Sequence, residues 1–425
     1  MATIKEVTKK SSMKVFRRLF MKRRETDGEY ETDWQTIPSI FIKKWGGVQA
    51  GTSDVLQSFF KFSGFNFTCE NNTGFFSDTT DDKSFFAGKL DRIRTLVKVE
   101  AGYTAETSTG SDVELPTSPT IFVGLIREDM AYRQDNLVNF KVNHLSSIFQ
   151  ETPADAIAGL GSTQSASDII TAIKNYTDGS NVLVFQKYIS SGGWNITATT
   201  NQYNMATTST LQGKSCWDLM RQLSEAENFI VYIDRLGDFH FKAKTEGSSI
   251  TAHFSGPGDT TDKTWGKNVL ANISVDQDVR NVFNRVEITF DTTSSLAVNQ
   301  ETWAWGDSSS SFRYGVRTFK YSNDLMGTTT ASTVGDNIFN EFQFPKQKVK
   351  VKTKFMPHLN VLDLTEITYK TQVRSGEAEY GTAVMDVDFW GERAGLNIEI
   401  DGNFKVWSYS HNIGNFTTQI ELRSI

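Results

Sequence analysis

The chain has 425 residues and a formal net charge of −6, so its surface as a whole is unsuited to binding nucleic acid or an anionic membrane, although a local basic patch is compatible with this balance. The length predicts two or three domains with substantial cores. The two cysteines, Cys69 and Cys216, lie far apart in the sequence, and there are only five histidines. We therefore expect neither a zinc site nor a fold that depends on a disulfide.

The sequence carries no recognisable signal for a membrane or for export. No apolar run approaches the length of a spanning helix, and no apolar segment follows the basic N-terminal residues. We expect synthesis in a cytosol-like place, where the protein stays until assembly or release. Composition favours β-structure, because 31 Phe, nine Trp and many Thr and Ser accompany only seven Pro, while Gly and Asn separate short apolar runs.

A basic segment, Lys14 to Arg24, lies within the first 38 residues. Its cations are Lys14, Arg17, Arg18, Lys22, Arg23 and Arg24, and they surround an apolar set made of Val15, Phe16, Leu19, Phe20 and Met21. This pattern suits either a helix or a strand. The favoured interpretation is an edge strand or arm with solvated charges, and the alternative is a contact with an anion.

Residues 1–146 are predicted to form a first β-barrel domain. Runs that mix alternation with paired aromatic residues are typical of barrel or sandwich strands buried on one side. The expected strands are Ile37 to Trp45, Gln57 to Cys69, Leu96 to Tyr103, Ile121 to Ile126 and Leu137 to Val142.

Residues 147–262 are predicted to form a smaller α+β domain. Ser165 and Asp168 have the spacing of a helix cap, and Gly179 lies beyond the end of that helix. A strand is expected from Val182 to Tyr188. The apolar stripe of the helix consists of Ile169, Ile170, Ile173 and Tyr176.

The clearest local pattern runs from Ser215 to Lys244. Ser215 and Asp218 have capping-box spacing, and Asn228 is a plausible end for the helix that follows. A strand from Phe229 to Ile233, a turn containing Gly237 and a return strand from Phe239 complete a hairpin. The expected helix stripe is Cys216, Leu219, Met220, Leu223 and Ala226, and the expected buried face of the return strand is Phe239, Phe241 and Ala243.

Residues 263–425 are predicted to form a second β-barrel domain, after a loop at Gly256 to Asp259. One helix, about Ser332 to Phe342, is expected to end before Pro345. The expected strands are Val286 to Phe290, Thr302 to Trp305, Lys348 to Phe355, Leu364 to Lys370, Val384 to Phe389, Phe404 to Tyr409 and Thr417 to Leu422.

A faint internal repeat connects the first and third segments. Strand, long loop, strand, turn and strand follow one another in both, with better agreement in order and spacing than in residues. The repeat predicts two barrels of one design on either side of the α+β domain, although such patterns also recur by chance in β-proteins. The corresponding runs are Leu96 to Val99, Ile121 to Ile126 and Val138 to Val142 in the first segment, and Leu364 to Tyr369, Phe404 to Tyr409 and Thr418 to Leu422 in the last.

Residues that could support catalysis or bind a metal show no convergent pattern. The sequence has no phosphate-binding glycine loop, nucleophile elbow or His-Glu-x-x-His motif. His240, on the wet face of the hairpin, and His253, in a Thr/Ser loop, are interpreted as ordinary surface residues. We expect no catalytic, cofactor-binding or metal-binding residues and no cofactor.

Several acidic pairs and the tryptophans are candidates for carbohydrate-binding or calcium-binding sites. Asp81 with Asp82, or Asp386 with Asp388, could serve a glycosidase, but a charged outer strand face with Val387 and Phe389 inside is favoured for the second pair. Asp276 and Asp278 lack the glycine and late glutamate of a calcium loop. The scattered tryptophans, including Trp34, Trp45, Trp217 and Trp390, are interpreted as core or rim anchors. A β-rich chain without a site favours a building block of an assembly.

Several stretches, in their order along the chain, are similar to those of one protein family. Phe67 to Phe76, Arg94 to Tyr103 and Ile121 to Ile126 resemble a first barrel, and Ser215 to Phe239 resembles a helix followed by a hairpin with an Asp-x-x-Gly turn. Arg280 to Val286 resembles the Asn-x-Val start of a second barrel, and Pro357 to Tyr369 resembles its final part. The family is that of the tail-hub or baseplate-hub proteins of tailed bacteriophages, also found in contractile injection systems.

This resemblance implies a mainly β, α+β fold and a non-enzymatic virion structural protein. Its implied form is a homotrimer in which two barrels per chain make a pseudo-sixfold ring. Such a symmetry adaptor joins a sixfold tail tube or distal-tail ring to a threefold tip, fibre or spike, and surrounds a channel for the tape measure protein and for DNA, which passes without specific binding. The implied location is the tail tip or baseplate of the virion, after assembly in the host cytoplasm.

Two further expectations depend on the resemblance. The basic segment Lys14 to Arg24 would contact an acidic neighbouring ring or lie near the DNA path. Because the sequence ends at Ile425, directly after a predicted barrel strand, we expect neither a hydrolase nor a fibre extension, and cell-wall cutting would belong to a partner. The alternatives are a carbohydrate-binding or glycan-degrading β-rich protein, and a hexameric distal-tail ring subunit.

Overall fold

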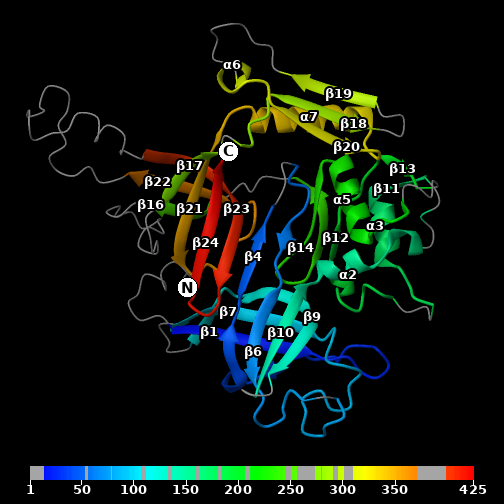
Figure 1. Ribbon diagram of the computed structural model, residues 1–425, viewed down its shortest axis with the longest axis vertical. Coiled ribbons are helices and arrows are strands. Elements are labelled where there is room, and N and C mark those ends of the chain that lie inside the picture. Colours follow the sequence, from blue (N-terminus) through cyan, green and yellow to red (C-terminus); the bar gives the residue numbers. More distant parts are fainter. Residues whose placement is uncertain are drawn as a thin grey trace, which may run out of the picture.

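The computed structural model is mainly β, with helices concentrated in the middle of the chain (Figure 1). The predicted strands at 302–305 and 384–389, the loop at 256–259, and Asp386, Asp388 and Trp390 lie outside the described residues. The structure describes residues 14–52, 56–77, 79–106, 112–132, 136–157, 160, 163–179, 183–205, 211–244, 250–255, 273–278, 280–290, 295–300, 310–370 and 399–425.

The first sheet has eight strands and comes wholly from the N-terminal segment. Within the described residues its neighbouring strands are antiparallel. Alternation places Phe65, Phe67 and Cys69 of one strand in its core. In order across the sheet the strands are β2 (Gln35–Ile37), β1 (Lys14–Lys22), β7 (Leu96–Glu106), β9 (Thr120–Tyr132), β10 (Leu137–His144), β6 (Phe65–Glu70) and β3 (Ile42–Trp45), with β8 (Asp112–Leu115) beside β7 and the 3₁₀ turn η1 (Ser39–Phe41) before β3.

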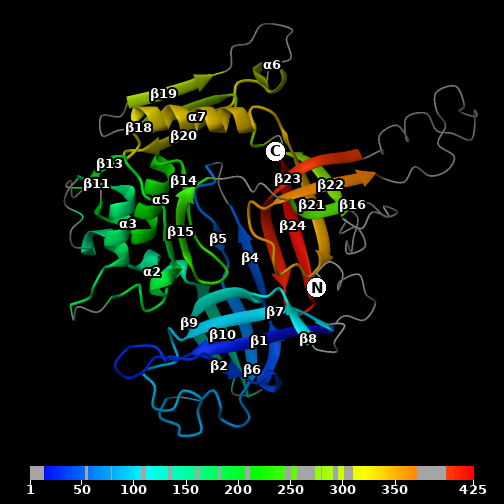
Figure 2. The same cartoon turned by 180° about the vertical axis from the view of Figure 1, so that it is seen from behind.

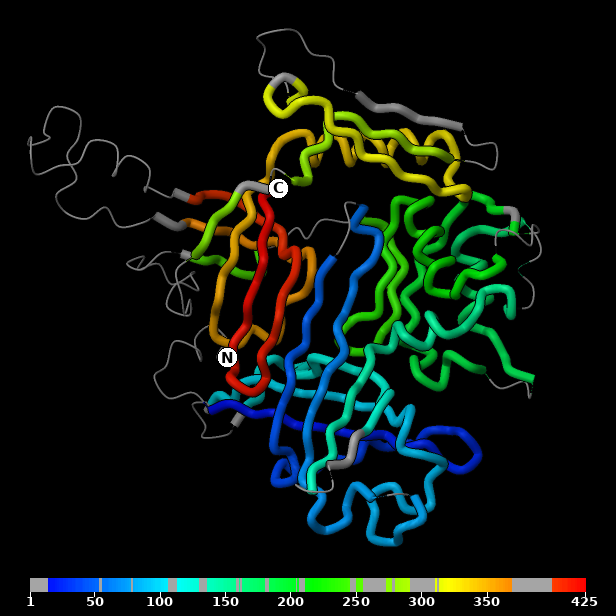
Figure 3. The backbone as a smooth tube through the Cα atoms, in the orientation of Figure 1, coloured from blue at the N-terminus to red at the C-terminus, as the bar shows by residue number. Residues whose placement is uncertain are grey.

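The second sheet also has eight strands, but two of them come from the N-terminal segment. The short strands β4 (Gly47–Gly51) and β5 (Lys61–Phe62) extend it, because β4 pairs with the far end of β23 (Figure 3). Along β4, Val48 is buried in the core of the first sheet and Ala50 in that of the second. The other strands, in order across the sheet, are β16 (Ile250–Ser255), β22 (Leu364–Lys370), β23 (Glu399–Asn412), β24 (Thr417–Ser424), β21 (Lys346–Lys354) and β17 (Ser274–Asp278).

Four strands of each sheet share one order. Four strands that follow one another as β6, β7, β9 and β10 lie in the order β7-β9-β10-β6, and β21 to β24 lie in the order β22-β23-β24-β21. The neighbouring strands in both sets are antiparallel. The repeat predicted from the sequence therefore corresponds to a repeat of topology. Within the described residues each sheet is an open path of strands, so the predicted closure into barrels is not confirmed.

A middle unit packs helices on a three-stranded sheet. Its capping box is confirmed, because Ser215 Oγ accepts the Asp218 backbone N–H at 3.1 Å, and Cys216 and Leu219 of the predicted stripe are fully buried. The elements are α2 (Ser146–Glu151), η2 (Ala154–Ala156), β11 (Thr163–Ser165), α3 (Ala166–Lys174), η3 (Ser191–Gly193), β12 (Trp194–Ile196), β13 (Gln202–Asn204), α5 (Cys216–Ala226), β14 (Phe229–Ile233) and β15 (Phe239–Ala243).

Two details of this unit differ from the prediction. Residues 184–188 form turns instead of a strand, and the backbone N–H groups of Tyr188 and Ile189 donate to the carbonyl of Phe185. The physical reason is that Phe185 and Ile189, four residues apart, enter the core together, a spacing of helical turns. In the return strand Phe239 and Phe241 are buried, but Ala243 is exposed at its end.

The described residues between 280 and 343 do not belong to the second sheet. They form a separate layer that covers α5 and the middle unit in Figure 1, and Val286, Ile288 and Ile338 join the middle unit's core. Its mixed sheet is built on β18, which is antiparallel to β19 and parallel to β20. The elements are β18 (Arg285–Phe290), β19 (Ser295–Gln300), α6 (Ser310–Tyr314), β20 (Thr318–Asn323) and α7 (Thr328–Phe342). The domain limits 1–146, 147–262 and 263–425 stay a prediction.

The basic segment forms β1, which is not an edge strand, because β2 and β7 pair with its two sides. Its arginines are engaged within the chain. Arg18 pairs with Glu100 and Glu114, Arg23 pairs with Glu31, and Arg24 lies 3.7 Å from Asp91. These contacts correct the interpretation of a solvated arm, since acidic residues on neighbouring segments neutralise the basic segment.

Among the helices that the structure describes, none has the length and apolar character of a membrane-spanning helix.

Candidate functional site

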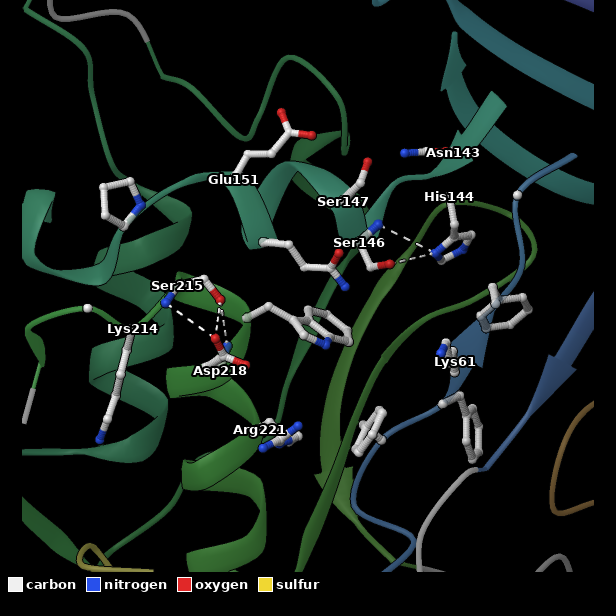
Figure 4. A pocket seen from close by; sticks show the side chains of 18 residues that line it. Lys61, Asn143, His144, Ser146, Ser147, Glu151, Lys214, Ser215, Asp218 and Arg221 are labelled. Atoms are coloured by element: carbon white, nitrogen blue, oxygen red, sulfur yellow. Dashed lines mark hydrogen bonds between the residues drawn. The ribbon is translucent and has the colours of Figure 1, made fainter. Parts of the chain in front are cut away.

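A groove with a cavity of about 930 Å³ separates the middle unit from the strand β5 (Figure 4). We call it the aromatic groove. Three kinds of element line it: the segment 59–64, the end of β10 with α2, and the start of α5. Its lining residues are Phe59, Phe60, Lys61, Phe62, Gly64, Asn143, His144, Ser146, Ser147, Gln150, Glu151, Pro153, Gly213, Lys214, Ser215, Trp217, Asp218 and Arg221.

Backbone pairing holds the aromatic wall of the groove in place. Phe59 forms a bridge to Val231 of β14, where the Val231 N–H donates to the carbonyl of Ser58 at 2.9 Å. Three residues later, the Phe62 ring stacks on His144 with 4.5 Å between ring centroids. This short segment thus crosses from the middle sheet to the second sheet, and its side chains line the groove on the way.

The charged side chains of the groove are largely engaged already. The Arg221 guanidinium lies 5.4 Å from the centre of the Phe59 ring and 3.6 Å from the carboxylate of Glu225. Lys214 donates to the Gln222 side chain at 2.8 Å, and burial lowers its pKa. Glu151 accepts from Arg127 at 2.8 Å. Lys61 is exposed.

One serine and histidine pair in the groove has the distance of a nucleophile and its base. Ser146 Oγ and His144 Nδ1 share a hydrogen bond of 3.2 Å (Figure 4). Burial lowers the pKa of His144 to about 3, so this imidazole is a weak general base at neutral pH. The imidazole is also stacked on the ring of Phe62. We assign the pair a structural role at the turn into α2.

The two histidines considered in the sequence analysis contact polar side chains of the same chain. His240 Nε2 lies 3.0 Å from Asp234 Oδ2, within one hairpin. His253 lies in strand β16, where a loop was expected, and shares a hydrogen bond of 2.8 Å with Thr368 Oγ1. In the described part of the chain no three His, Cys, Asp or Glu residues are grouped so as to hold a metal ion.

The acidic candidates do not converge on one another. Asp276 and Asp278 lie in strand β17 and not in a loop. Asp81 accepts the backbone N–H of Lys83 at 3.0 Å, which makes it a turn residue. The two cysteines are buried in different cores, and burial raises the pKa of both thiols to about 12.

The tryptophans of the described chain anchor cores, as expected. Trp45 is buried in the core of the first sheet and Trp217 in that of the middle unit, while Trp34 packs against the latter core from its rim. They form no shared carbohydrate-binding surface in the described chain, since Trp45 and Trp217 are less than a tenth exposed.

A buried polar junction between the hairpin and the second sheet was missed by sequence reasoning. Arg235, in the hairpin turn, donates to the carbonyl of Ser118 at 3.0 Å, and Tyr409 and Asp363 lie across a cavity of about 320 Å³. Burial raises the pKa of Asp363 to about 6 and lowers those of His358 and His411 to about 4 and 3. No local signal marks these residues, because they meet only through tertiary contacts.

Comparison with known proteins finds likeness in structure only. No family model and no curated protein matches the chain. A tail protein from Neisseria meningitidis MC58 is 9% identical, with 97% of this chain and 96% of that chain covered and a TM-score of 0.53. A 43 kDa tail protein of prophage MuSo2 from Shewanella oneidensis is 11% identical, with 96% and 98% covered and a TM-score of 0.48. Prophage tail protein gp18 from Listeria monocytogenes is 10% identical, with 96% and 94% covered and a TM-score of 0.48. The chain therefore shares its fold with this Neisseria meningitidis tail protein, which agrees with the resemblance found in the sequence.

Proposed function

We propose that this chain is a structural hub protein of a phage tail or baseplate, which forms a homotrimeric ring with pseudo-sixfold symmetry. The single observation that carries the proposal is the order that four strands of one eight-stranded sheet share with four strands of the other. Three chains with two equivalent modules each present six modules around an axis, so one ring offers sixfold and threefold matching surfaces. The fold likeness to a tail protein over nearly the whole chain supports this function.

The two modules are held together within each chain, as a symmetry adaptor requires. Phe355 and Ile413 of the C-terminal segment are buried in the core of the first sheet, and β4 of the N-terminal segment extends the second sheet. Coupling of this kind keeps the two sheets of a subunit at a fixed spacing. Closure of each sheet into a barrel belongs to this proposal.

In this role the ring joins a sixfold tail tube or distal-tail ring to a threefold tip, fibre or spike. The channel passes the tape measure protein and DNA without specific binding. The chain works by presenting surfaces to its partners. Assembly in the host cytoplasm and residence in the virion complete the proposal.

Electron microscopy of the purified protein and of isolated tails tests the proposal. We expect rings with threefold symmetry, six similar lobes around an axial channel, and three copies of the chain per tail. A ring of six identical copies would support the distal-tail alternative. A monomer that binds or cleaves polysaccharide and is absent from tails would overturn the structural function.

A further inference from the structure

Strand β21 carries an unusual run of lysines on one face. Its sequence from Lys346 to Lys354 places lysine at every second position, while Val349, Val351 and Thr353 between them are buried. Because alternate side chains of a strand point to opposite faces, the lysines share the outer face of the second sheet. Lys350 and Lys352 are exposed, and neither lies within ion-pair distance of a carboxylate in the described chain.

This face is hollowed into a cavity of about 760 Å³, which we call the lysine trough. Lys61 of β5 lies at one rim, and Lys350 and Lys352 of β21 lie at the other. The three strands β4, β23 and β24 lie between them and contribute small polar side chains such as Ser408 and Ser410. Glu421 is the one carboxylate among the lining residues, and Lys348 neutralises it at 2.8 Å, while Asp276 of β17 lies opposite Lys348 and outside the lining. The trough therefore carries an excess of positive charge.

The lining of the trough favours an acidic polypeptide over a nucleic-acid strand. Binding of single strands relies on exposed aromatic rings on which bases stack. The one aromatic side chain of the lining, Tyr409, is only 4% exposed and belongs to the core beneath the floor. Lysine ammonium groups flanked by serine hydroxyls suit carboxylates instead, as point charges with neutral hydrogen-bond donors between them.

The same chain carries an acidic surface that matches this charge. In the loop between β1 and β2, residues 25–33, every second residue is acidic: Glu25, Asp27, Glu29, Glu31 and Asp33. Glu25, Glu29 and Glu31 pair with lysine or arginine of the same chain, whereas Asp27 and Asp33 are exposed and pair with no cation in the described residues. This loop, dark blue beyond β1, lies on the opposite side of the molecule from β21 in both views (Figures 1 and 2).

We propose that the acidic loop of one subunit docks into the lysine trough of the next subunit and thereby closes the ring. The proposal rests on the proposed homotrimer and names its interface. Contact between two different surfaces is the kind that generates a closed ring of identical subunits, and opposite placement of the surfaces on one subunit allows it. Charge complementarity at such an interface fixes partner and register.

Charge reversal tests the interface on the full chain. Light scattering should give a trimer for the unchanged protein, and raised salt should weaken its association. Lys350→Glu with Lys352→Glu should weaken association at least about tenfold, since like charges then face each other. Asp27→Lys with Asp33→Lys should do the same, and all four changes in one chain should restore the trimer.

Matched controls separate this effect from loss of folding or of net charge. Lys44→Glu with Lys83→Glu makes the same change in charge at exposed positions outside the trough and should leave the trimer intact. Circular dichroism should be unchanged in every variant, because all the altered side chains are exposed.

Several results would overturn the interface. One is that the protein with Lys350→Glu and Lys352→Glu keeps the mass of the unchanged trimer. Another is that the protein with all four substitutions does not form a trimer again. A trough reversal that abolishes retention of duplex DNA without changing the mass would assign the trough to nucleic acid. If every variant still forms rings with threefold symmetry, this interface is wrong but the proposed hub function is unaffected. If tails contain no ring of this chain, the proposed function itself is wrong.

Discussion

The hydroxyl group of Tyr103 on β7 donates a hydrogen bond to the backbone carbonyl of Phe355, 2.7 Å away and 252 residues later in the chain. Both side chains are fully buried, and Phe355 packs in the core of the first sheet although it follows β21 of the second. Burial raises the pKa of Tyr103, so the phenol keeps the proton that it donates. This bond connects the two sheets, which the proposed ring would hold at a fixed spacing.

Tyr103→Phe should lower the free energy of unfolding by about 1–2 kcal/mol, because the Phe355 carbonyl would be left buried without its donor. The midpoint of urea unfolding measures the loss. Tyr176→Phe is the control, since the hydroxyl of the partly buried Tyr176 bonds to nothing in the described chain. Equal effects of the two changes would contradict a bond that couples the sheets.

Arg17 fastens the turn between β23 and β24 to the first sheet. Its Nη1 donates to the carbonyls of Ile413 and Gly414, both at 3.3 Å, and its guanidinium lies 5.2 Å from the centre of the Trp45 ring. Arg17→Lys keeps the charge but loses the planar fork, so amide hydrogen exchange at residues 413–416 should become faster. Unchanged exchange there would show that the turn is held by Ile413 burial alone.

The ion pairs of the basic segment within the chain affect what a charge reversal of this segment can show. Reversing Arg18, Arg23 and Arg24 to glutamate would set like charges against Glu100, Glu31 and Asp91. We expect such a protein to lose stability before any contact with an acidic ring or DNA is tested. Its failure to assemble would therefore not identify an anion contact.

Glu225 of α5 is a buried carboxylate that joins three parts of the chain. It accepts from Ser58 Oγ at 3.1 Å and from the hydroxyl of Tyr321 on β20, and it is 4% exposed. Glu225→Ala should cost about 2–4 kcal/mol, because the hydroxyls of Ser58 and Tyr321 lose their acceptor, whereas Glu225→Gln should cost less.

A double-mutant cycle with Tyr321→Phe checks the role of Glu225. The two costs should be less than additive by about 1 kcal/mol or more, because both changes remove one shared hydrogen bond. Strictly additive effects would mean that the layer of residues 280–343 is held on α5 by apolar packing without this bond.

Acid should destabilise the protein through its buried histidines. Burial lowers the pKa of His144 and His411 to about 3, while the unfolded imidazoles titrate near their ordinary value of about 6.5. Between these values the unfolded state binds more protons, so stability falls as the pH drops below about 6.5. Each imidazole should cost about 2 kcal/mol between pH 7 and pH 5.

One carboxyl group opposes this effect. The pKa of Asp363 is raised to about 6, so the folded state binds more protons than the unfolded state between about pH 3.9 and pH 6. In that range acid stabilises the folded state.

Melting temperatures of the unchanged protein and of His411→Asn at pH 7 and pH 5 measure the net result. The variant should be less stable at pH 7 but should lose less on acidification. An equal loss in both proteins would rule His411 out as a source of the pH dependence.

Elements with short-range signals were predicted well. The caps at Ser165 and Ser215, the hairpin turn at Gly237 with φ of +91°, and the alternating strands β10 and β24 each depend on residues a few positions apart. The order of the repeated strands was also visible, because alternation and turn residues recur at similar spacing in both segments.

The sequence alone therefore determined the mainly β character, the helix starts and the strand repeat of this protein, because propensity, caps and alternation act between near neighbours. Only the tertiary structure decided that β4 joins the C-terminal sheet, that the described residues between 280 and 343 leave it, and that Arg18 and Arg23 of the basic segment pair with carboxylates within the chain. These features arise from contacts between residues tens to hundreds of positions apart. Backbone groups at a sheet edge pair with any extended segment, and an arginine pairs with any nearby carboxylate, so no local pattern marks which partner is chosen.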